Sequence, residues 1–287
     1  MKDYIKLMRI KHYIKNGLIF LPLLFSRNLL QPELLKKTFF GFILFSLACS
    51  IVYILNDIFD AEKDRNHSTK KNRPIASGRV SKTQAVIFIL VLTILIISLN
   101  YICFSSFLPH PLILTYLILN LLYSFYLKNV PIIDIAVLSV GFILRVFFGA
   151  ALINVAVSDW LYLTVMAMSF YLGLGKRRNE VLKNETGTRK VLSKYNKNFL
   201  DKNMYVCVAL TIVFYAMWCI DTVELIPHIM WTVPLVMIIC MKYSLTVEGI
   251  SDGDPVSTLL HDRFLFLLVL LYGATIFTLI YILPYWN

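Results

Sequence analysis

The amino-acid sequence predicts an all-helical integral membrane protein, with its 287 residues forming a single membrane-embedded domain. Hydrophobic residues make up 58% of the chain and charged residues 16%, and the mean hydropathy is +0.71. Soluble domains are ordinarily about 45–50% apolar and about a quarter charged. A soluble globule, a disordered chain and a fibrous repeat are therefore excluded, because each would expose too much apolar surface to water.

The chain begins with a basic amphipathic segment, residues 1–14, which is predicted to be a helix lying at the membrane interface. The next apolar stretch, residues 13–30, is short and contains Pro22. Hydropathy alone does not decide whether this stretch crosses the membrane or is re-entrant.

Eight further stretches each approach the roughly 20 apolar residues that a transmembrane helix needs. They cover residues 38–55, 83–104, 111–127, 132–153, 160–174, 204–220, 226–245 and 264–283.

The distribution of lysine and arginine decides the crossing of residues 13–30. If this stretch spans, 24 of the 28 basic residues fall on one side, including those of the long loops 56–82 and 176–203. Cytoplasmic loops carry the excess of basic residues in membrane proteins. The sequence therefore predicts nine transmembrane helices in the cell membrane, with the N-terminus in the cytoplasm and the C-terminus outside.

The net charge of +11 is compatible with a nucleic acid, an anionic lipid or an anionic small molecule as partner. The orientation of the loops accounts for most of this charge, so we expect no nucleic-acid partner. The oligomeric state is not predicted.

Three aspartates at the cytoplasmic end of the 38–55 helix give the strongest chemical signal. Asp57, Asp60 and Asp64 stand at i, i+3 and i+7, so on a helix they fall within about 60° of one another. Mg²⁺ relieves the repulsion in such a cluster and also recruits substrate phosphates. The alternative is a solvated acidic helix end whose charges pair with Lys63 and Arg65.

A basic loop follows directly and ends in turn-forming residues. Arg65, Lys71 and Arg73 carry donors that suit phosphate oxygens, as do backbone N–H groups near Gly78. Beside a magnesium site, these donors favour a diphosphate as ligand.

These motifs resemble the UbiA-type membrane prenyltransferase superfamily, whose signature NDxxDxxxD is matched by Asn56, Asp57, Asp60 and Asp64. The resemblance implies a helical bundle around a cytoplasm-facing central cavity. It also implies that these four residues are catalytic and hold Mg²⁺.

The chain departs from that superfamily after its sixth predicted helix. Where usual members carry a second aspartate-rich motif, this chain has Lys176, Arg177 and Arg178, followed by Glu180. Basic side chains in place of a second metal site favour a donor with an additional phosphate.

The pattern is similar to the branch of the superfamily that contains decaprenyl-phosphate phosphoribosyltransferases. Shared features are the pair Lys15 and Asn16, the loop 71–78, and a His-Asp-Arg element at His261. The resemblance implies 5-phosphoribosyl 1-diphosphate as donor, a polyprenyl phosphate as acceptor, and a role in making cell-envelope glycan precursors.

The alternative within the superfamily is a conventional prenyltransferase that moves a prenyl group from its diphosphate to an aromatic acceptor. A transporter or scaffold without catalysis is a third reading. Transporters often place charges near the membrane midplane, whereas here most charge lies at the predicted cytoplasmic mouth.

Five other polar residues have open roles. Lys128, Asp134 and Arg145 are candidates for substrate binding, and Arg145 stands out because it lies within a predicted span. Asp252 and Asp254 could bind metal, but they flank a glycine in a turn where aspartate is common.

Overall fold

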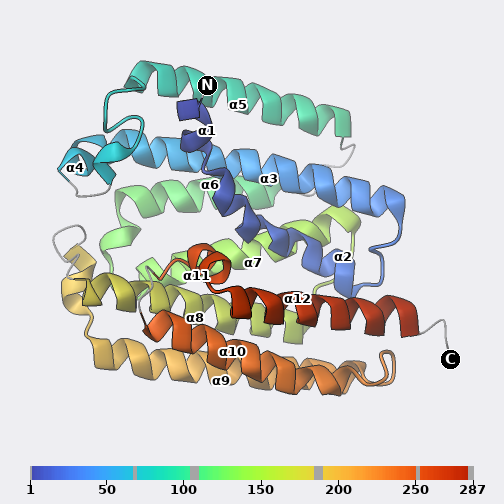
Figure 1. Ribbon diagram of the computed structural model, residues 1–287. Helices are drawn as coiled ribbons and strands as arrows, with labels where there is room; N and C mark the ends of the chain where they lie inside the picture. Colours follow the sequence, from blue (N-terminus) through green and yellow to red (C-terminus); the bar gives the residue numbers. More distant parts are fainter. Residues whose placement is uncertain (1, 67–69, 104–109, 184–189, 250–252, 284–287) are drawn as a thin grey trace. The chain divides into compact units, whose positions relative to one another are not determined.

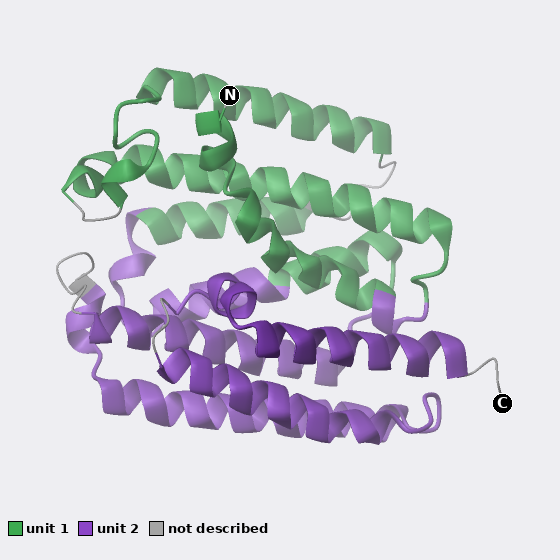
Figure 2. Cartoon of the chain, viewed as in Figure 1, with its two compact units in different colours: residues 1–23, 28–124, 144–155 green, residues 24–27, 125–143, 156–287 purple. Residues whose placement is uncertain are grey.

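The computed structural model describes residues 2–66, 70–103, 110–183, 190–249 and 253–283 (Figure 1). Every regular element within these ranges is helical, so the all-helical class is confirmed for the described part of the chain. The described residues form two compact units (Figure 2). Unit 1 comprises residues 1–23, 28–124 and 144–155, and unit 2 the remainder, so the boundary falls inside one helix, α7.

From the N-terminus to α6, the described residues form eight helical elements. They are α1 (Lys2–Met8), the 3-10 helix η1 (Ile10–Phe20), α2 (Leu21–Phe25), α3 (Pro32–Phe59), α4 (Ala61–Arg65), η2 (Lys70–Asn72), α5 (Lys82–Cys103) and α6 (His110–Phe125).

The second half begins with η3 and α7 and ends with a short π-helical turn. Its elements are η3 (Leu127–Asn129), α7 (Ile133–Ile153), α8 (Asp159–Leu182), η5 (Lys190–Lys194), α9 (Lys197–Thr222), η6 (Ile229–Trp231), α10 (Thr232–Glu248), α11 (Pro255–His261), α12 (Arg263–Phe277) and η7 (Thr278–Ile282).

Six helical segments in the described residues are long and apolar enough to cross a membrane. They are Pro32–Phe59, Lys82–Cys103, Ile133–Ile153, Lys197–Thr222, Ile229–Glu248 and Arg263–Ile282. The apolar helix Pro111–Phe125 is shorter, and α8 carries Lys176, Arg177 and Arg178 near its C-terminal end. Nine spans therefore stay a prediction.

The N-terminal segment differs from the single interfacial helix predicted over residues 1–14. Helix α1 ends at Met8, and Arg9 takes the left-handed conformation, with φ 53° and ψ 49°. The chain then continues as η1 and α2. Pro22 is the second residue of α2, where a missing N–H costs no helical hydrogen bond, so this proline starts a helix.

In unit 1, α3 packs against α1, η1 and α5. Its buried face carries Phe45, whose ring contacts those of Tyr116 on α6 and Phe148 on α7. Gly149 faces the backbone carbonyl of Ile19, which leaves no room for a Cβ at this position. The N-terminal segment is thereby held close to the C-terminal half of α7.

In unit 2, α8 and α9 lie side by side along their length, and α10 packs against both. The buried core of this unit contains Tyr171, Leu200, Met204 and Tyr243. Tyr171 Oη and Ser244 Oγ form a hydrogen bond of 2.5 Å, so the polar end of this buried ring is satisfied. This packing fixes the C-terminal end of α8, where the sequence places its second basic motif.

Membrane topology is tested by reporter fusions. A reporter fused after Asn287 should be active outside the membrane, and reporters in loops 56–82 and 176–203 should be active only in the cytoplasm. The physical reason is the concentration of basic residues on one side. Fusion-protein activity is the measurement, and a cytoplasmic C-terminus would show that residues 13–30 do not cross.

Candidate active site

The candidate active site in unit 1 is built on the C-terminal end of α3. Asp57 lies in the last turn of α3 and is 2% exposed, and Asp64 lies in α4 and is 5% exposed. The N–H of Asp60 bonds to Asn56 O at 2.9 Å, and the N–H of Asp64 bonds to Asp60 O at 2.8 Å. The helical course thus continues through Asp60, and it brings Asp57 and Asp64 to the same side.

Two arginines meet these carboxylates. Arg9 Nη2 lies 2.5 Å from Asp57 Oδ1. Arg73 Nη1 lies 3.2 Å from the same oxygen and 2.7 Å from Asp64 Oδ2. One guanidinium nitrogen therefore stands between two buried carboxylates that are seven residues apart in the sequence.

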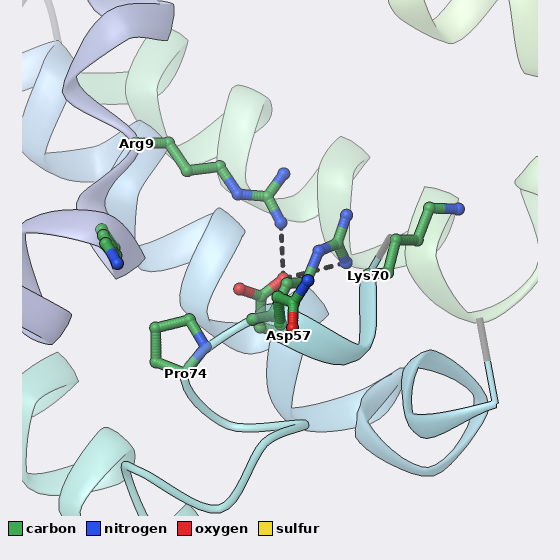
Figure 3. A pocket seen from close by; sticks show the side chains of 7 residues that line it. Arg9, Asp57, Lys70 and Pro74 are labelled. Atoms are coloured by element: carbon green, nitrogen blue, oxygen red, sulfur yellow. Dashed lines mark hydrogen bonds and ion pairs between the residues drawn. The ribbon is translucent and has the colours of Figure 1, made fainter. Parts of the chain in front are cut away.

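A cavity of about 320 Å³ opens beside these ion pairs (Figure 3). Its lining side chains come from α1, the residue that follows α1, the end of α3 and the 70–74 segment: Lys6, Arg9, Asp57, Lys70, Asn72, Arg73 and Pro74. Four of these seven residues are cationic and one is anionic. Such a lining attracts anions, and guanidinium groups suit phosphate oxygens in particular.

The donor set at this point fits a hard divalent cation. Mg²⁺ is typically held by one or two carboxylates together with substrate phosphates and water. Asp57 and Asp64 supply two carboxylates that already converge on one cationic nitrogen of Arg73. Asn56 Oδ1 accepts a hydrogen bond from Ser124 Oγ on α6. Within the described ranges, no three His, Cys, Asp or Glu side chains gather as a metal-binding group.

In unit 2 the basic motif of α8 joins a buried ion-pair network. Arg177 is 0% exposed, and its Nε lies 2.5 Å from Asp134 Oδ2, at the start of α7. Its Nη1 lies 2.5 Å from Glu180 Oε2. Tyr195 Oη donates to Asp134 Oδ1 at 2.5 Å and accepts from the N–H of Ile132 at 2.6 Å.

This network ties together three segments of unit 2: the start of α7, the end of α8 and the residue after η5. Burial raises the pKa of Tyr195, and its hydrogen bond to Asp134 acts in the same direction. Tyr195 is therefore held as a neutral phenol that donates its proton to Asp134.

The neighbours of Arg177 on α8 are also placed by this unit. Arg178 is 4% exposed, and its Nε lies 2.5 Å from Asp201 Oδ1 on α9. Asn179 Nδ2 donates to the carbonyl of Val247 at 3.0 Å. Lys176 is half-buried. Any phosphate that approached Arg177 or Arg178 would compete with a carboxylate already in place.

The structure brings Asn16 and Arg145 together inside unit 1. Arg145 Nε donates to Asn16 Oδ1 at 2.7 Å, and Nη2 lies 3.3 Å from Tyr116 Oη. The guanidinium also lies over the rings of Phe45 and Tyr116, at 5.1 and 5.0 Å from their centroids. Asn16 Nδ2 bonds to Ser46 Oγ at 2.8 Å. These contacts describe a polar cluster that joins η1, α3, α6 and α7.

The profile of the UbiA prenyltransferase family matches residues 18–268. The chain belongs to the UbiA prenyltransferase family. A protein of Corynebacterium glutamicum named decaprenyl-phosphate phosphoribosyltransferase is 30% identical over 98% of this chain and 87% of its own length. A protein of the same name from Mycobacterium tuberculosis, strain H37Rv, is 30% identical over 85% of this chain and 82% of its own length.

The fold of this UbiA-family chain is shared with a solved structure. A UbiA homologue from Archaeoglobus fulgidus, solved bound to GPP and Mg²⁺, superposes with a TM-score of 0.71 at 16% identity, covering 97% of this chain and 99% of the homologue. At this identity the likeness establishes the fold. The chain is thus a membrane-embedded transferase of the UbiA family.

The other predicted substrate-binding residues of this UbiA-family protein lie on or between short helical elements. Lys15 and Lys128 are half-buried, on η1 and η3, and Lys71 is exposed on η2. Arg65 Nε donates to the carbonyl of Ala76 at 3.3 Å and so closes the loop that carries Arg73. The predicted loop 56–82 thus contains α4 and η2.

The aspartates near the last helix are capping residues. Asp254 accepts hydrogen bonds from the N–H groups of Val256 and Ser257 and caps α11, while Asp252 lies outside the described residues. Asp262 caps α12 and pairs with Lys242 at 2.7 Å. The hydrogen bond from Lys242 lowers the pKa of Asp262 to about 2, so this carboxylate is charged at neutral pH.

Five of the seven residues that line the cavity are not among the site residues predicted from the sequence: Lys6, Arg9, Lys70, Asn72 and Pro74. Arg9 is 48 positions before its partner Asp57, and no local motif links them. For Lys6 and Arg9 the available signal was the basic character of the N-terminal segment, which membrane orientation already explained. Lys70, Asn72 and Pro74 lie in the basic loop that follows Asp64.

Proposed function

We propose that this protein transfers 5-phosphoribose from 5-phosphoribosyl 1-diphosphate to a polyprenyl phosphate of decaprenyl type and releases diphosphate. The product would serve as a precursor of cell-envelope glycans, and the reaction would take place at the cytoplasmic face of the membrane. The observation that carries the proposal is the likeness, over 98% of the chain, to a protein named decaprenyl-phosphate phosphoribosyltransferase.

The cationic cavity supports a phosphate-bearing donor. Lys6, Arg9, Lys70 and Arg73 surround Asp57 in a space of about 320 Å³. A diphosphate that leaves during the reaction develops negative charge, and preorganised cations lower the energy of that transition state. We assign neutralisation of the leaving diphosphate to these side chains.

The reaction balances without a protein base. An oxygen of the acceptor phosphate forms a bond to ribose C1, while the bond from C1 to the diphosphate oxygen breaks and its electron pair leaves with the diphosphate. The acceptor phosphate is already an anion, so no proton has to be removed from it. A single displacement of this kind inverts the configuration at C1.

Asp57, Asp60 and Asp64, with Asn56, are proposed to hold Mg²⁺. When bound, the ion would supply positive charge to the diphosphate oxygens. Asp57 and Asp64 support this assignment, since their carboxylates converge on one cationic atom. Arg73 would then be displaced from between them and become available to a phosphate oxygen.

The donor's 5-phosphate is assigned to the basic motif of α8, which consists of Lys176, Arg177 and Arg178. The further substrate-binding assignments made from the sequence remain proposals. They concern Lys15, Asn16, Arg65, Lys71, Lys128, Asp134, Arg145 and Glu180.

Two labelled donors test the proposed function on one preparation of purified protein with Mg²⁺. We expect transfer of label from 5-phosphoribosyl 1-diphosphate to a polyprenyl phosphate, measured as a lipid-extractable product. The second assay supplies a labelled prenyl diphosphate with an aromatic acceptor and should give no product.

The opposite pattern would identify a conventional prenyltransferase. If neither assay gives a product, with protein that elutes as a single folded species, the result would contradict the proposal that the protein is an enzyme and would favour a transporter or scaffold.

A further inference from the structure

The N-terminal segment of unit 1 is attached to α3 by polar contacts along one face. Tyr13 Oη lies 2.7 Å from Ser50 Oγ, and Arg9 Nη2 lies 2.5 Å from Asp57 Oδ1. Ser50 and Asp57 are seven residues apart on α3 and therefore face the same direction. α1 and η1 both pack against α3. The cavity residue Arg9 thus lies within a segment that α3 holds by hydrogen bonds.

Ser50 is the central contact of this attachment. It is 0% exposed, and its Oγ lies 3.0 Å from the carbonyl oxygen of Met8 as well as near Tyr13. Its single proton can be donated to Met8 O while the Tyr13 hydroxyl donates to Ser50 Oγ. The carbonyl of Ser46, one turn earlier on α3, lies 3.1 Å away and competes for that proton.

Met8 is the last residue of α1, and carbonyls at a helix C-terminus lack helical partners. The next residue, Arg9, takes the left-handed conformation, which residues with a Cβ rarely adopt. Ser50 therefore stabilises the C-terminal end of α1, directly before the left-handed residue Arg9. Beyond the turn, the Arg9 guanidinium lies 4.9 Å from the ring centroid of Tyr53 before it reaches Asp57.

We propose that Ser50 is a positioning residue of the cationic cavity. It holds the end of α1, and thereby the left-handed turn that points Arg9 at Asp57, and so acts on a bound diphosphate through Arg9 without touching it. The inference rests on the proposed function in one respect, namely that the cavity takes a ligand with a diphosphate group.

A double-mutant cycle tests this role. The full-length protein, its S50A and R9Q variants and the double variant are titrated with inorganic diphosphate and with 5-phosphoribosyl 1-diphosphate, each with Mg²⁺. S50A should weaken both dissociation constants by about threefold to tenfold, the range of one hydrogen bond. In the R9Q background, S50A should add less than about twofold, because its effect passes through Arg9.

Two further variants make the result specific. Y13F removes the hydroxyl that donates to Ser50 Oγ and leaves Ser50 freer to donate to the competing carbonyl of Ser46. It should therefore weaken diphosphate binding in the same direction as S50A but to a smaller extent, and it carries the test if S50A does not fold. S139A is the matched control: Ser139 is 0% exposed on α7, and among the described residues its hydroxyl bonds only the Ile135 carbonyl of its own helix. It should leave diphosphate binding unchanged.

Three outcomes would overturn the role of Ser50. They are unchanged diphosphate binding in folded S50A and Y13F, an equal loss from S50A with and without Arg9, and a wild-type protein that does not bind inorganic diphosphate. Failure of the proposed function is seen separately, as absence of ribosylated lipid from a protein whose diphosphate binding still depends on Ser50 and Arg9.

Discussion

Replacement of Asp57 or Asp64 by asparagine is expected to reduce transferase turnover by about 10²–10⁴-fold. Each variant keeps the side-chain shape and removes one of two buried carboxylates that converge on Arg73. A metal ion shared by both residues would lose an anionic ligand, and the leaving diphosphate would lose part of its neutralisation. The measurement is the rate of labelled-lipid formation at saturating donor, with each variant checked for folding by thermal unfolding.

E62Q is the matched control for these variants. Glu62 lies in the same short helix as Asp64, but its side chain is 81% exposed, and its ion-pair partner among the described residues is Lys82, at 3.8 Å. Loss of its charge should change turnover by less than about twofold, as surface substitutions usually do.

The dependence of turnover on a bound metal ion tests the same site independently. EDTA should abolish turnover and added Mg²⁺ restore it, while binding of Mn²⁺, followed by electron paramagnetic resonance, should be lost in the Asp57 and Asp64 variants. Near-wild-type turnover and Mn²⁺ binding in both variants would instead make the aspartates structural partners of Arg9 and Arg73.

The hydropathy of the sequence and the spacing of its apolar residues predict the helices of this chain well, because both depend on how each segment buries its own apolar side chains. Each of the eight stretches predicted to span coincides with a helix in the described part of the chain. The start of the chain is the exception. The left-handed residue Arg9 follows Met8, whose carbonyl accepts a hydrogen bond from Ser50, 42 residues further along the chain, and no local pattern encodes such a contact.

Some features of the candidate site can likewise be predicted from the local sequence, and others cannot. The stripe of Asp57 and Asp64 follows from helical spacing, which the structure preserves through Asp60. The partners of the basic motif do not follow from spacing, since Arg177 pairs with Asp134 across 43 positions and two helices. The sequence predicts a substrate-binding role for both residues. Local patterns indicate which side chains share a face, whereas ion pairs between helices are decided by tertiary packing.

Replacement of Arg177 by methionine is expected to destabilise the protein by about 3–5 kcal/mol. Methionine approximates the length of the side chain and removes its charge, which leaves Asp134, itself 0% exposed, without its guanidinium partner. Glu180 loses the same partner. The cost of breaking a buried ion pair comes mainly from the charge left uncompensated in a medium of low dielectric.

Thermal unfolding in detergent micelles measures this effect, with Lys183→Met as control. Lys183 is exposed at the C-terminal end of the same helix, so its replacement should stay within about 0.5 kcal/mol of the wild type. Arg177→Lys should rescue poorly, because an ammonium group lacks the planar fork that contacts two carboxylates at once. The double variant Arg177→Met, Asp134→Asn should recover part of the loss, since it removes one of the uncompensated charges. If Arg177→Met unfolds at the wild-type temperature and only donor binding falls, Arg177 serves the phosphate and the buried network is dispensable for folding.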